Sequence, residues 1–342
     1  MSLNKSAEQM APSDPTGVVA SAIRPRGLVL TDNSGGNGGA QPVSPAIHTD
    51  NLRKQYRNTV ALEGLSMTVN RGEVFGFLGP NGAGKTTAVK LLLGLVHATS
   101  GEAMVLGAPA GDVETRARIG YLPELFRFQA WLTAKEVLLL HCRLAKLPSQ
   151  QWAYLVSEAL AAVGLVERQN DKVGGFSKGM QQRLGLGVAL LGEPQLVVLD
   201  EPTSALDPVG RHDVRQIIRV LRSRGTTVFL NTHLLEEVEH VCDRVAVIDK
   251  GQTIAMGTIA ELVGKESSVR LQVTGLDGSW WRSFESFGTW NSDEGWLIVS
   301  GIEASRVPDL INAVVALGGR IGAVIPEHKS LEDRFLELLR QA

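Results

Sequence analysis

The sequence has 342 residues, of which 44% are hydrophobic and 20% are charged, and its formal net charge is -2. This composition is typical of a globular protein with a sizeable core, and its slightly acidic balance does not favour binding to nucleic acid. No apolar run reaches the roughly 18 residues that a membrane-spanning helix needs, so a membrane location would require a separate partner.

Along the chain, a polar stretch is followed by alternating strand and helix patterns. Residues 1–45 are rich in Gly, Ser, Pro and Asn, which predicts a flexible tail. Short apolar runs bounded by turn residues predict buried strands at 74–78, 196–199 and 227–230. Helical patterns occupy 84–95, 135–144 and 209–222. This alternation predicts an α/β fold around a mainly parallel sheet covered on both faces.

Two further units are predicted around this core. Residues 131–192 have an almost wholly helical pattern, so we expect a helical subdomain inserted into an α/β domain that spans 46–264. After Gly264 the pattern changes, and we expect a small α+β domain at 265–342. Its strands are predicted at 268–273, 296–299 and 321–325, and its helices at 306–317 and 331–340.

A glycine-rich segment follows the first buried strand and opens a helix. It reads Gly-Pro-Asn-Gly-Ala-Gly-Lys-Thr over residues 79–86 and matches the phosphate-binding pattern G-x-x-x-x-G-K-[ST] at every fixed position. Glycines allow a tight turn whose N–H groups point at phosphates, and the helix N-terminus adds partial positive charge. The residues predicted to bind ATP here are Gly79, Pro80, Asn81, Gly82, Ala83, Gly84, Lys85, Thr86 and Thr87.

Side chains of this loop and of a later strand predict the chemistry. Lys85 is expected to reach the β- and γ-phosphates, and the Thr86 hydroxyl to bind Mg²⁺. Asp200 and Glu201 end the strand at 196–199, beside the loop in this class of fold. We expect Asp200 to hold Mg²⁺ and Glu201 to polarise the attacking water as general base. Two solvated acids at a strand end are the alternative, which the phosphate loop disfavours.

Further motifs occur in the order found in the ABC ATPase family, and residues 46–264 resemble that family. Phe-Ser-Lys-Gly-Met at 176–180 stands in the place of the family signature, and Ser-Ala-Leu-Asp at 204–207 in that of the D-loop. His233 resembles the switch histidine that senses the γ-phosphate. Tyr56 stands where the family stacks an aromatic ring on adenine, although an ordinary strand aromatic is the alternative.

This resemblance implies a P-loop NTPase core and a mechanism that needs two chains. Two nucleotide-binding domains would meet head to tail, so that the signature residues Ser177, Lys178 and Gly179 contact ATP bound to the other chain. Asp207 would link the two sites. ATP would close the dimer and hydrolysis would release it. A separate integral-membrane permease would hold this homodimer at the cytoplasmic face of the membrane.

Two departures from the commonest family pattern affect the expected contacts. The signature reads FSKGM instead of LSGGQ, so a lysine replaces a glycine in the contact between chains. The Q-loop position carries Glu124, whose carboxylate is still expected to bind Mg²⁺. Both departures resemble the ATPases of drug, lipid or polysaccharide exporters.

For some other residues the sequence allows two interpretations. Phe126, Phe128 and Trp131 either line a groove for a permease helix or form the core of the helical subdomain. The C-terminal domain contains the tryptophans Trp280, Trp281, Trp290 and Trp296. These side chains either pack in the core of the domain, which is the interpretation we favour, or form a ligand pocket. Residues Glu236, Glu237 and Glu239 are expected on a solvated helix face.

The sequence therefore predicts the ATP-hydrolysing subunit of an ABC exporter. A soluble ABC ATPase acting on ribosomes or DNA is one alternative, but such proteins usually carry two nucleotide domains, long coiled coils or zinc motifs. A weakly active regulatory ATPase is another, because the signature is atypical. Intact Lys85, Asp200, Glu201 and His233 argue against it. The transported substrate is not encoded in this chain, since the permease surrounds it.

Overall fold

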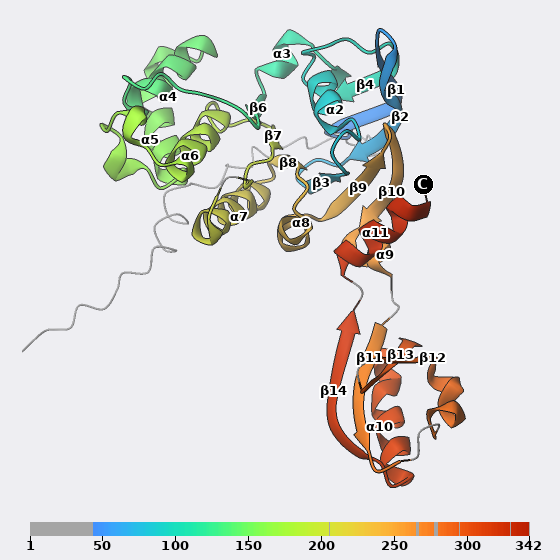
Figure 1. Ribbon diagram of the computed structural model, residues 1–342. Helices are drawn as coiled ribbons and strands as arrows, with labels where there is room; N and C mark the ends of the chain where they lie inside the picture. Colours follow the sequence, from blue (N-terminus) through green and yellow to red (C-terminus); the bar gives the residue numbers. More distant parts are fainter. Residues whose placement is uncertain are drawn as a thin grey trace, which may run out of the picture.

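The structure is a computed structural model, and the strands of its described residues form a ten-stranded and a four-stranded sheet (Figure 1). The described residues are 44–204, 206–264, 267–276, 280–293, 295–328 and 330–341. Residues 1–43 of the predicted tail therefore lie outside the described part. None of the helices in the described ranges combines the length and the apolar character that crossing a bilayer requires.

One half of the larger sheet is parallel, as the sequence predicts. Its strands, in spatial order, are β9 (Arg244–Asp249), β3 (Val74–Leu78), β8 (Thr227–Asn231), β7 (Leu196–Asp200) and β6 (Ile119–Leu122). Every neighbouring pair among these five runs parallel. All residues of β3, β7 and β8 are buried, which explains why these strands are continuous apolar runs. The carboxyl ends of β3, β7 and β8 consequently meet at one edge of the sheet.

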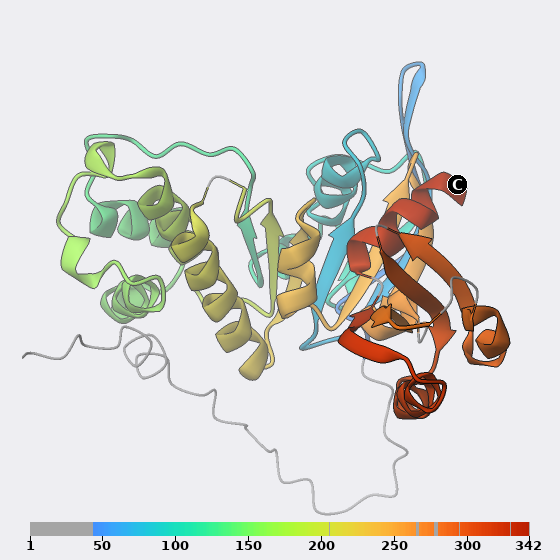
Figure 2. The same cartoon turned by 60° about the horizontal axis from the view of Figure 1, so that its bottom comes forward.

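Beyond β9 the sheet continues with strands that pair mainly antiparallel. Its strands are β10 (Gln252–Thr258), β2 (Thr59–Val69), β1 (Ile47–Tyr56), β4 (Ser100–Val105) and β5 (Ala108–Pro109). Only one residue pair, Gln252 with Gly64, joins β10 to β2. The β1–β2 hairpin extends past the rest of the sheet (Figure 2). The sequence patterns had not assigned these strands individually.

Helices cover both faces of the large sheet. On one face, α2 (Lys85–Leu92) packs against β3 and β7, and α3 (Val113–Arg116) lies nearby. On the other face lie α7 (Pro208–Ser223), α8 (Leu235–Val241) and α9 (Ile259–Val263). Helix α2 is shorter than the predicted 84–95, because the chain leaves the helix after the C-cap residue Leu93.

The predicted helical region contains three helices and three short 3₁₀ turns. They are α4 (Ala134–Leu144), α5 (Trp152–Ala162), α6 (Lys178–Ala189), η1 (Ser149–Gln151), η2 (Val166–Arg168) and η3 (Val173–Gly175). One hydrophobic cluster joins these helices to α7 and to the facing side of β6, β7 and β8. The helices therefore share a continuous core with the sheet that carries the strand ends.

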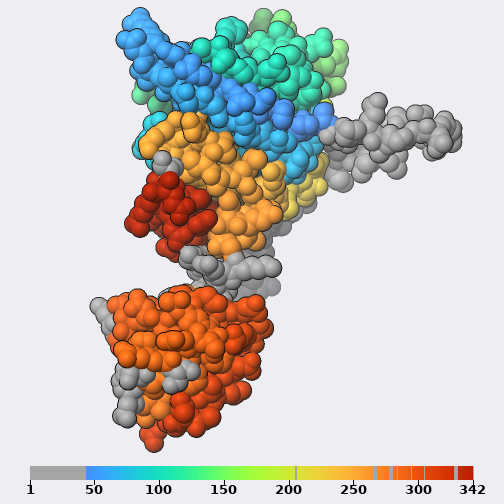
Figure 3. Space-filling model, turned by 90° about the vertical axis from the view of Figure 1, so that its right-hand side faces the viewer, coloured from blue at the N-terminus to red at the C-terminus, as the bar shows by residue number. Residues whose placement is uncertain are grey.

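A smaller unit lies beyond α9 and forms a separate body in Figure 3. Its elements are β11 (Ser267–Thr274), η4 (Trp280–Phe287), β12 (Thr289–Asp293), β13 (Trp296–Ile302), η5 (Ala304–Arg306), α10 (Val307–Ala316) and β14 (Arg320–His328). The sheet order is β12-β13-β11-β14. Trp280 and Trp290 pack against its hydrophobic cluster, with ring centroids 5.8 Å apart. This packing agrees with the core reading of those two tryptophans.

The last helix, α11 (Leu331–Gln341), does not pack on this small sheet. It returns to α8 and α9, where Leu331 is buried in a cluster with Leu78 and Val238. The Leu331 N–H donates a 2.8 Å hydrogen bond to Oε1 of Glu239 on the C-terminal half of α8. Grouping 331–340 with the C-terminal domain was therefore incorrect, because an amphipathic pattern shows an apolar face but not which surface covers it.

The expectation of a solvated acidic face on α8 was wrong for one of its three residues, because Glu237 is only 3% exposed. Glu236 and Glu239 are exposed as predicted, although Glu239 also accepts the hydrogen bond at the start of α11. Oε2 of Glu237 lies 3.7 Å from the Nε atom of Arg215 on α7. The partner of each acid comes from a distant part of the chain, so the charge pattern of α8 alone did not reveal it.

Candidate functional site

The phosphate loop joins the buried end of β3 to the first turn of α2. Gly82 and Gly84 have φ angles of 84° and 102°, in the left-handed region that glycine tolerates best. Gly84 is the N-cap of α2, and no side chain caps the N–H groups of the first helical turn. The first turn also contains no acidic residue. Its free N–H groups and partial positive charge form a ready site for an anion.

Lys85 lies at the start of α2 and is 8% exposed. Its Nζ atom donates hydrogen bonds to the carbonyl oxygens of Gly79, at 2.6 Å, and Pro80, at 3.1 Å. Burial lowers the pKa of Lys85 below its usual value, against the opposing effect of nearby carboxylates such as Glu201 and Asp200. The ammonium group is therefore held inside the loop by oxygens that phosphate oxygens can replace.

Asp200 ends β7 and Asn231 ends β8, as register partners in the parallel sheet. Both side chains are almost fully buried, and Nδ2 of Asn231 donates a 2.5 Å hydrogen bond to Oδ1 of Asp200. Burial raises the pKa of Asp200 above its usual value, and Glu124 and Glu201 add to this effect. Asn231 and Lys85 act in the opposite direction. Asp200 is thus a buried carboxyl group whose negative charge is stabilised by Asn231 and Lys85.

Glu201 follows β7 and is held by residues that follow β8. Its Oε1 atom lies 2.8 Å from Nδ1 of His233, and a carboxylate accepts there from a protonated ring nitrogen. The Thr232 hydroxyl donates a longer hydrogen bond, 3.4 Å, to Oε2. Glu201 has a φ of 50°, an unusual left-handed conformation for a residue with a side chain. Strained backbone of this kind is concentrated at functional sites.

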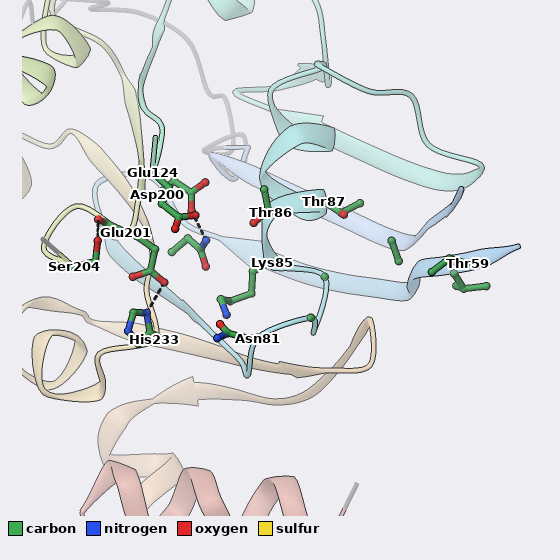
Figure 4. A pocket seen from close by; sticks show the side chains of 15 residues that line it. Thr59, Asn81, Lys85, Thr86, Thr87, Glu124, Asp200, Glu201, Ser204 and His233 are labelled. Carbon is green, nitrogen blue, oxygen red and sulfur yellow. Dashed lines mark hydrogen bonds and ion pairs between the residues drawn. The ribbon is translucent and has the colours of Figure 1, made fainter. Parts of the chain in front are cut away.

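A cavity of about 440 Å³ brings these groups together. Figure 4 shows the acidic side chains and His233 on one side, Thr86 and Thr87 of α2 on the other, and Lys85 between them. The predicted residues that line it are Asn81, Gly82, Gly84, Lys85, Thr86, Thr87, Glu124, Asp200, Glu201 and His233. Lining residues that the sequence did not single out as ligands are Thr59, Val60, Ala61, Ser204 and Asn231.

The remaining predicted residues of the loop support the cavity without lining it. Gly79 and Pro80 supply the carbonyl oxygens that hold Lys85, and Ala83 is a buried residue of the loop itself. Tyr56 lies at the end of β1 with 42% of its surface exposed, and the Nζ atom of Lys54 is 4.8 Å from its ring centroid. Tyr56 is thus on the exposed hairpin, next to the strand that begins with the lining residue Thr59.

The signature residues lie outside the cavity, at the N-terminus of α6. The Ser177 hydroxyl is the N-cap and accepts a 3.2 Å hydrogen bond from the Met180 N–H. Ser177 and Lys178 are exposed, and the first turn of α6 contains no acidic residue. In the D-loop motif, Ser204 lines the cavity and Asp207 caps α7, whereas Ala205 lies outside the described residues.

The oxygen atoms lining the cavity suit a hard cation such as Mg²⁺. Thr86, Asp200 and Glu124 offer a hydroxyl and two carboxylates. In the described part of the chain, no cluster of three or more His, Cys, Asp or Glu side chains forms a metal site by itself. Mg²⁺ is usually held by one or two protein oxygens together with substrate phosphates, so the hydroxyl and carboxylates of this cavity are suitable ligands. A buried acceptor, Oδ1 of Asn231, also lacks a hydrogen-bond partner beside Asp200.

A phosphate loop opening α2 and an acidic pair ending β7 define a P-loop nucleoside triphosphatase. The family model described as ABC transporter matches residues 62–204. An uncharacterized ABC transporter ATP-binding protein of Nostoc sp. is 38% identical over 312 residues, which cover 86% of this chain and 90% of that protein. The chain belongs to the ATP-binding proteins of ABC transporters, and it is an ATPase that binds ATP.

Two further comparisons agree with this assignment. A Nod factor export ATP-binding protein I of Burkholderia thailandensis is 36% identical over 297 residues, covering 85% of this chain and 96% of that protein. A solved ATP-binding subunit of an ABC transporter is 29% identical, with a TM-score of 0.58. The match covers 64% of this chain and 91% of that structure. The α/β fold with a P-loop ATPase core is therefore confirmed.

Proposed function

We propose that this chain hydrolyses ATP in order to drive export through a separate permease. The assembly of Lys85, Asp200, Glu201 and His233 around one cavity carries the hydrolysis part of the proposal, because a phosphate-binding lysine, a magnesium-binding carboxylate and a residue that acts on the attacking water are recurring parts of phosphoryl transfer. The Nod factor exporter subunit named above supports the export direction. The permease would hold the chain at the cytoplasmic face of the membrane.

Individual roles follow from the positions of the side chains. Lys85 would exchange its two carbonyl partners for the β- and γ-phosphates, assisted by the N–H groups that open α2. Thr86, Asp200 and Glu124 would hold Mg²⁺, which supplies neutralisation of the phosphate charge when bound. Glu201 would take a proton from the attacking water, and His233 would hold the Glu201 carboxylate and sense the γ-phosphate.

The signature would complete the site of a second copy of this chain. Ser177, Lys178 and Gly179 lie at an exposed helix N-terminus outside the cavity, so this turn is free to meet phosphates presented by another chain. Lys178 adds a positive charge where the common signature has glycine. Two head-to-tail copies would then form two shared sites, and ATP would act as the contact between them.

A mixing experiment tests the shared site. Lys85→Ala removes the phosphate lysine, and Ser177→Arg blocks the signature, so each variant alone should lose most of its ATPase activity. Mixed dimers contain one site with both an intact Lys85 and an intact Ser177, and the mixture should recover part of the activity. A mixture as inactive as the two separate variants would show that the signature does not act on the other chain.

A second experiment tests the general base. Glu201→Gln keeps the hydrogen-bonding shape but cannot accept a proton, so it should bind ATP and accumulate as a dimer while hydrolysis falls about 100-fold or more. Glu167→Gln, an exposed acid of η2, is the control and should behave like the native chain. Dimer formation is measured by light scattering and hydrolysis by phosphate release. Native hydrolysis by Glu201→Gln would contradict the assignment.

The permease would dock on the segment after Glu124. Trp131 is 71% exposed and Leu125 is 87% exposed, whereas Phe126 and Phe128 pack against the core that includes α4 and α6. The two phenylalanines therefore fit the interpretation as core residues, and Trp131 fits the interpretation as a contact for the permease. Trp131→Ala should weaken recovery of the permease with little change in the basal ATPase rate of the isolated chain. Unchanged recovery would remove Trp131 from the interface.

A further inference from the structure

Asn231 occupies a position where the surrounding strand is apolar. It follows Val228, Phe229 and Leu230 at the carboxyl end of β8, and it is 1% exposed. A buried amide without partners is unfavourable, so an apolar residue would suit this position if packing were its only task. The amide instead reaches Asp200 on the neighbouring strand and lines the cavity.

The orientation of the Asn231 amide is set by its neighbour. Nδ2 lies 2.5 Å from Oδ1 of Asp200, and only the NH₂ end of the amide can donate to a carboxylate. Rotating the amide by half a turn would place its carbonyl oxygen against that carboxylate. The bond therefore fixes both groups: it holds Asp200 in one orientation, and it directs the amide oxygen away from Oδ1.

This arrangement leaves an acceptor without a partner. In the described residues, Oδ1 of Asn231 is buried and accepts no hydrogen bond. Buried polar atoms are nearly always satisfied in folded proteins, so an unsatisfied one in a cavity wall indicates a missing donor. A water molecule bound to a cation can supply such a donor, and Asp200, Glu124 and Thr86 provide oxygen ligands in the same cavity.

We propose that Asn231 is a positioning residue for the Mg²⁺ site. Its NH₂ group holds Asp200 so that the second carboxylate oxygen is available to the cation, and its carbonyl oxygen accepts from the cation's hydration shell. Asn231 would therefore set how tightly the ATP-bound protein holds a divalent cation. It would have little influence on ATP bound without metal, because the phosphate loop makes those contacts. This inference rests on the proposed nucleotide site.

Two variants of the same shape isolate the donor group. Asn231→Val and Asn231→Thr are both β-branched strand formers, but only threonine offers a hydroxyl that can donate to Asp200. Mn²⁺ serves as the probe, and its affinity for the full chain with a non-hydrolysable ATP analogue is measured by electron paramagnetic resonance. Fluorescence of mant-ATP in EDTA measures nucleotide binding without metal.

We expect Asn231→Val to weaken Mn²⁺ binding by about tenfold, the effect of losing one hydrogen bond to a charged group, and Asn231→Thr to recover part of the loss. Binding of mant-ATP in EDTA should stay within about twofold of native. Thr227→Val, at the other end of β8, is the control: its hydroxyl accepts a 2.9 Å bond from the Gly72 N–H, so it should change stability but not Mn²⁺ affinity.

Native Mn²⁺ affinity in a folded Asn231→Val chain would overturn the proposal, as would equal losses in the valine and threonine variants. Loss of Mn²⁺ affinity in Thr227→Val to the same extent would also overturn it, because the effect would then reflect disturbance of the strand. Failure of the native chain to bind mant-ATP would be a different result, since it would refute the nucleotide site itself.

Discussion

Gly84 links the shape of the phosphate loop to the neighbouring strand β2. Its φ of 102° is unfavourable for any residue with a side chain, and a Cβ atom there would lie 2.4 Å from the carbonyl oxygen of Ala61. Gly82 in the same loop also has a positive φ, 84°, but a Cβ atom there would have no other atom within 4 Å. Both alanine variants therefore have the cost of a positive φ, but only Gly84→Ala adds a clash with Ala61.

The expected magnitudes follow from this difference. A non-glycine residue in the left-handed region costs about 1–2 kcal/mol, which is all that Gly82→Ala should lose. Gly84→Ala must also displace the backbone of β2 at Ala61, and overpacking of this kind costs about 1–3 kcal/mol more. The displacement would also move Val60 and Ala61 in the cavity wall, so ATP affinity should fall about tenfold further than in Gly82→Ala.

The two variants are compared by urea unfolding and by titration with mant-ATP. Following the first unfolding transition avoids the assumption that the whole chain unfolds in one step. Gly84→Ala should be the less stable variant and the weaker binder. Equal losses in both variants would show that the close approach of Gly84 to Ala61 has no energetic consequence.

Three other predictions concern stability, pH and charge. Leu331→Ala should destabilise the protein by about 2–5 kcal/mol, because this 1% exposed side chain packs on α8, and an unchanged urea midpoint would contradict the docking of α11. Burial lowers the pKa of His141, so the folded state favours the neutral ring. The contribution of the neutral ring to the free energy of unfolding is therefore present above the unfolded pKa of about 6.5 and is lost as the pH falls. His141→Leu should therefore reduce the loss of stability between about pH 7 and about pH 5, and an equally steep loss in the variant would exclude this histidine. Lys85→Ala should weaken ATP binding by about 10-fold or more in equilibrium titrations, and native affinity would show that the lysine does not reach the phosphates.

The sequence predicted the parts of the fold that depend on local pattern. The apolar strands predicted at 74–78, 196–199 and 227–230 match β3, β7 and β8, of which the last two extend one residue further. The loop at 79–86 was likewise found from its motif, and it leads into α2. The meeting of Asp200, Glu201 and Lys85 also followed, because the carboxyl ends of neighbouring parallel strands lie at one edge.

Features that depend on distant partners were missed. Asn231 carries no motif, and its importance appears only where β8 lies beside β7 in register with Asp200. The contact of Glu239 with Leu331 joins residues 92 positions apart, so neither the charge pattern of α8 nor the apolar face of α11 predicted it. Thr59, Val60 and Ala61 entered the cavity wall because the β1–β2 hairpin folds beside the loop.

The proposed action of this ATPase on a membrane permease can be tested by affinity purification. The tagged chain is recovered from detergent-solubilised membranes of its own cell, with an untagged chain as control, and the retained proteins are identified by mass spectrometry. Retention of a polytopic membrane protein in stoichiometric amount is the predicted result, and the identity of that protein would point to the transported substrate. Recovery of soluble partners alone, such as ribosomes or DNA-repair proteins, would leave the ATPase site intact but contradict the transport function.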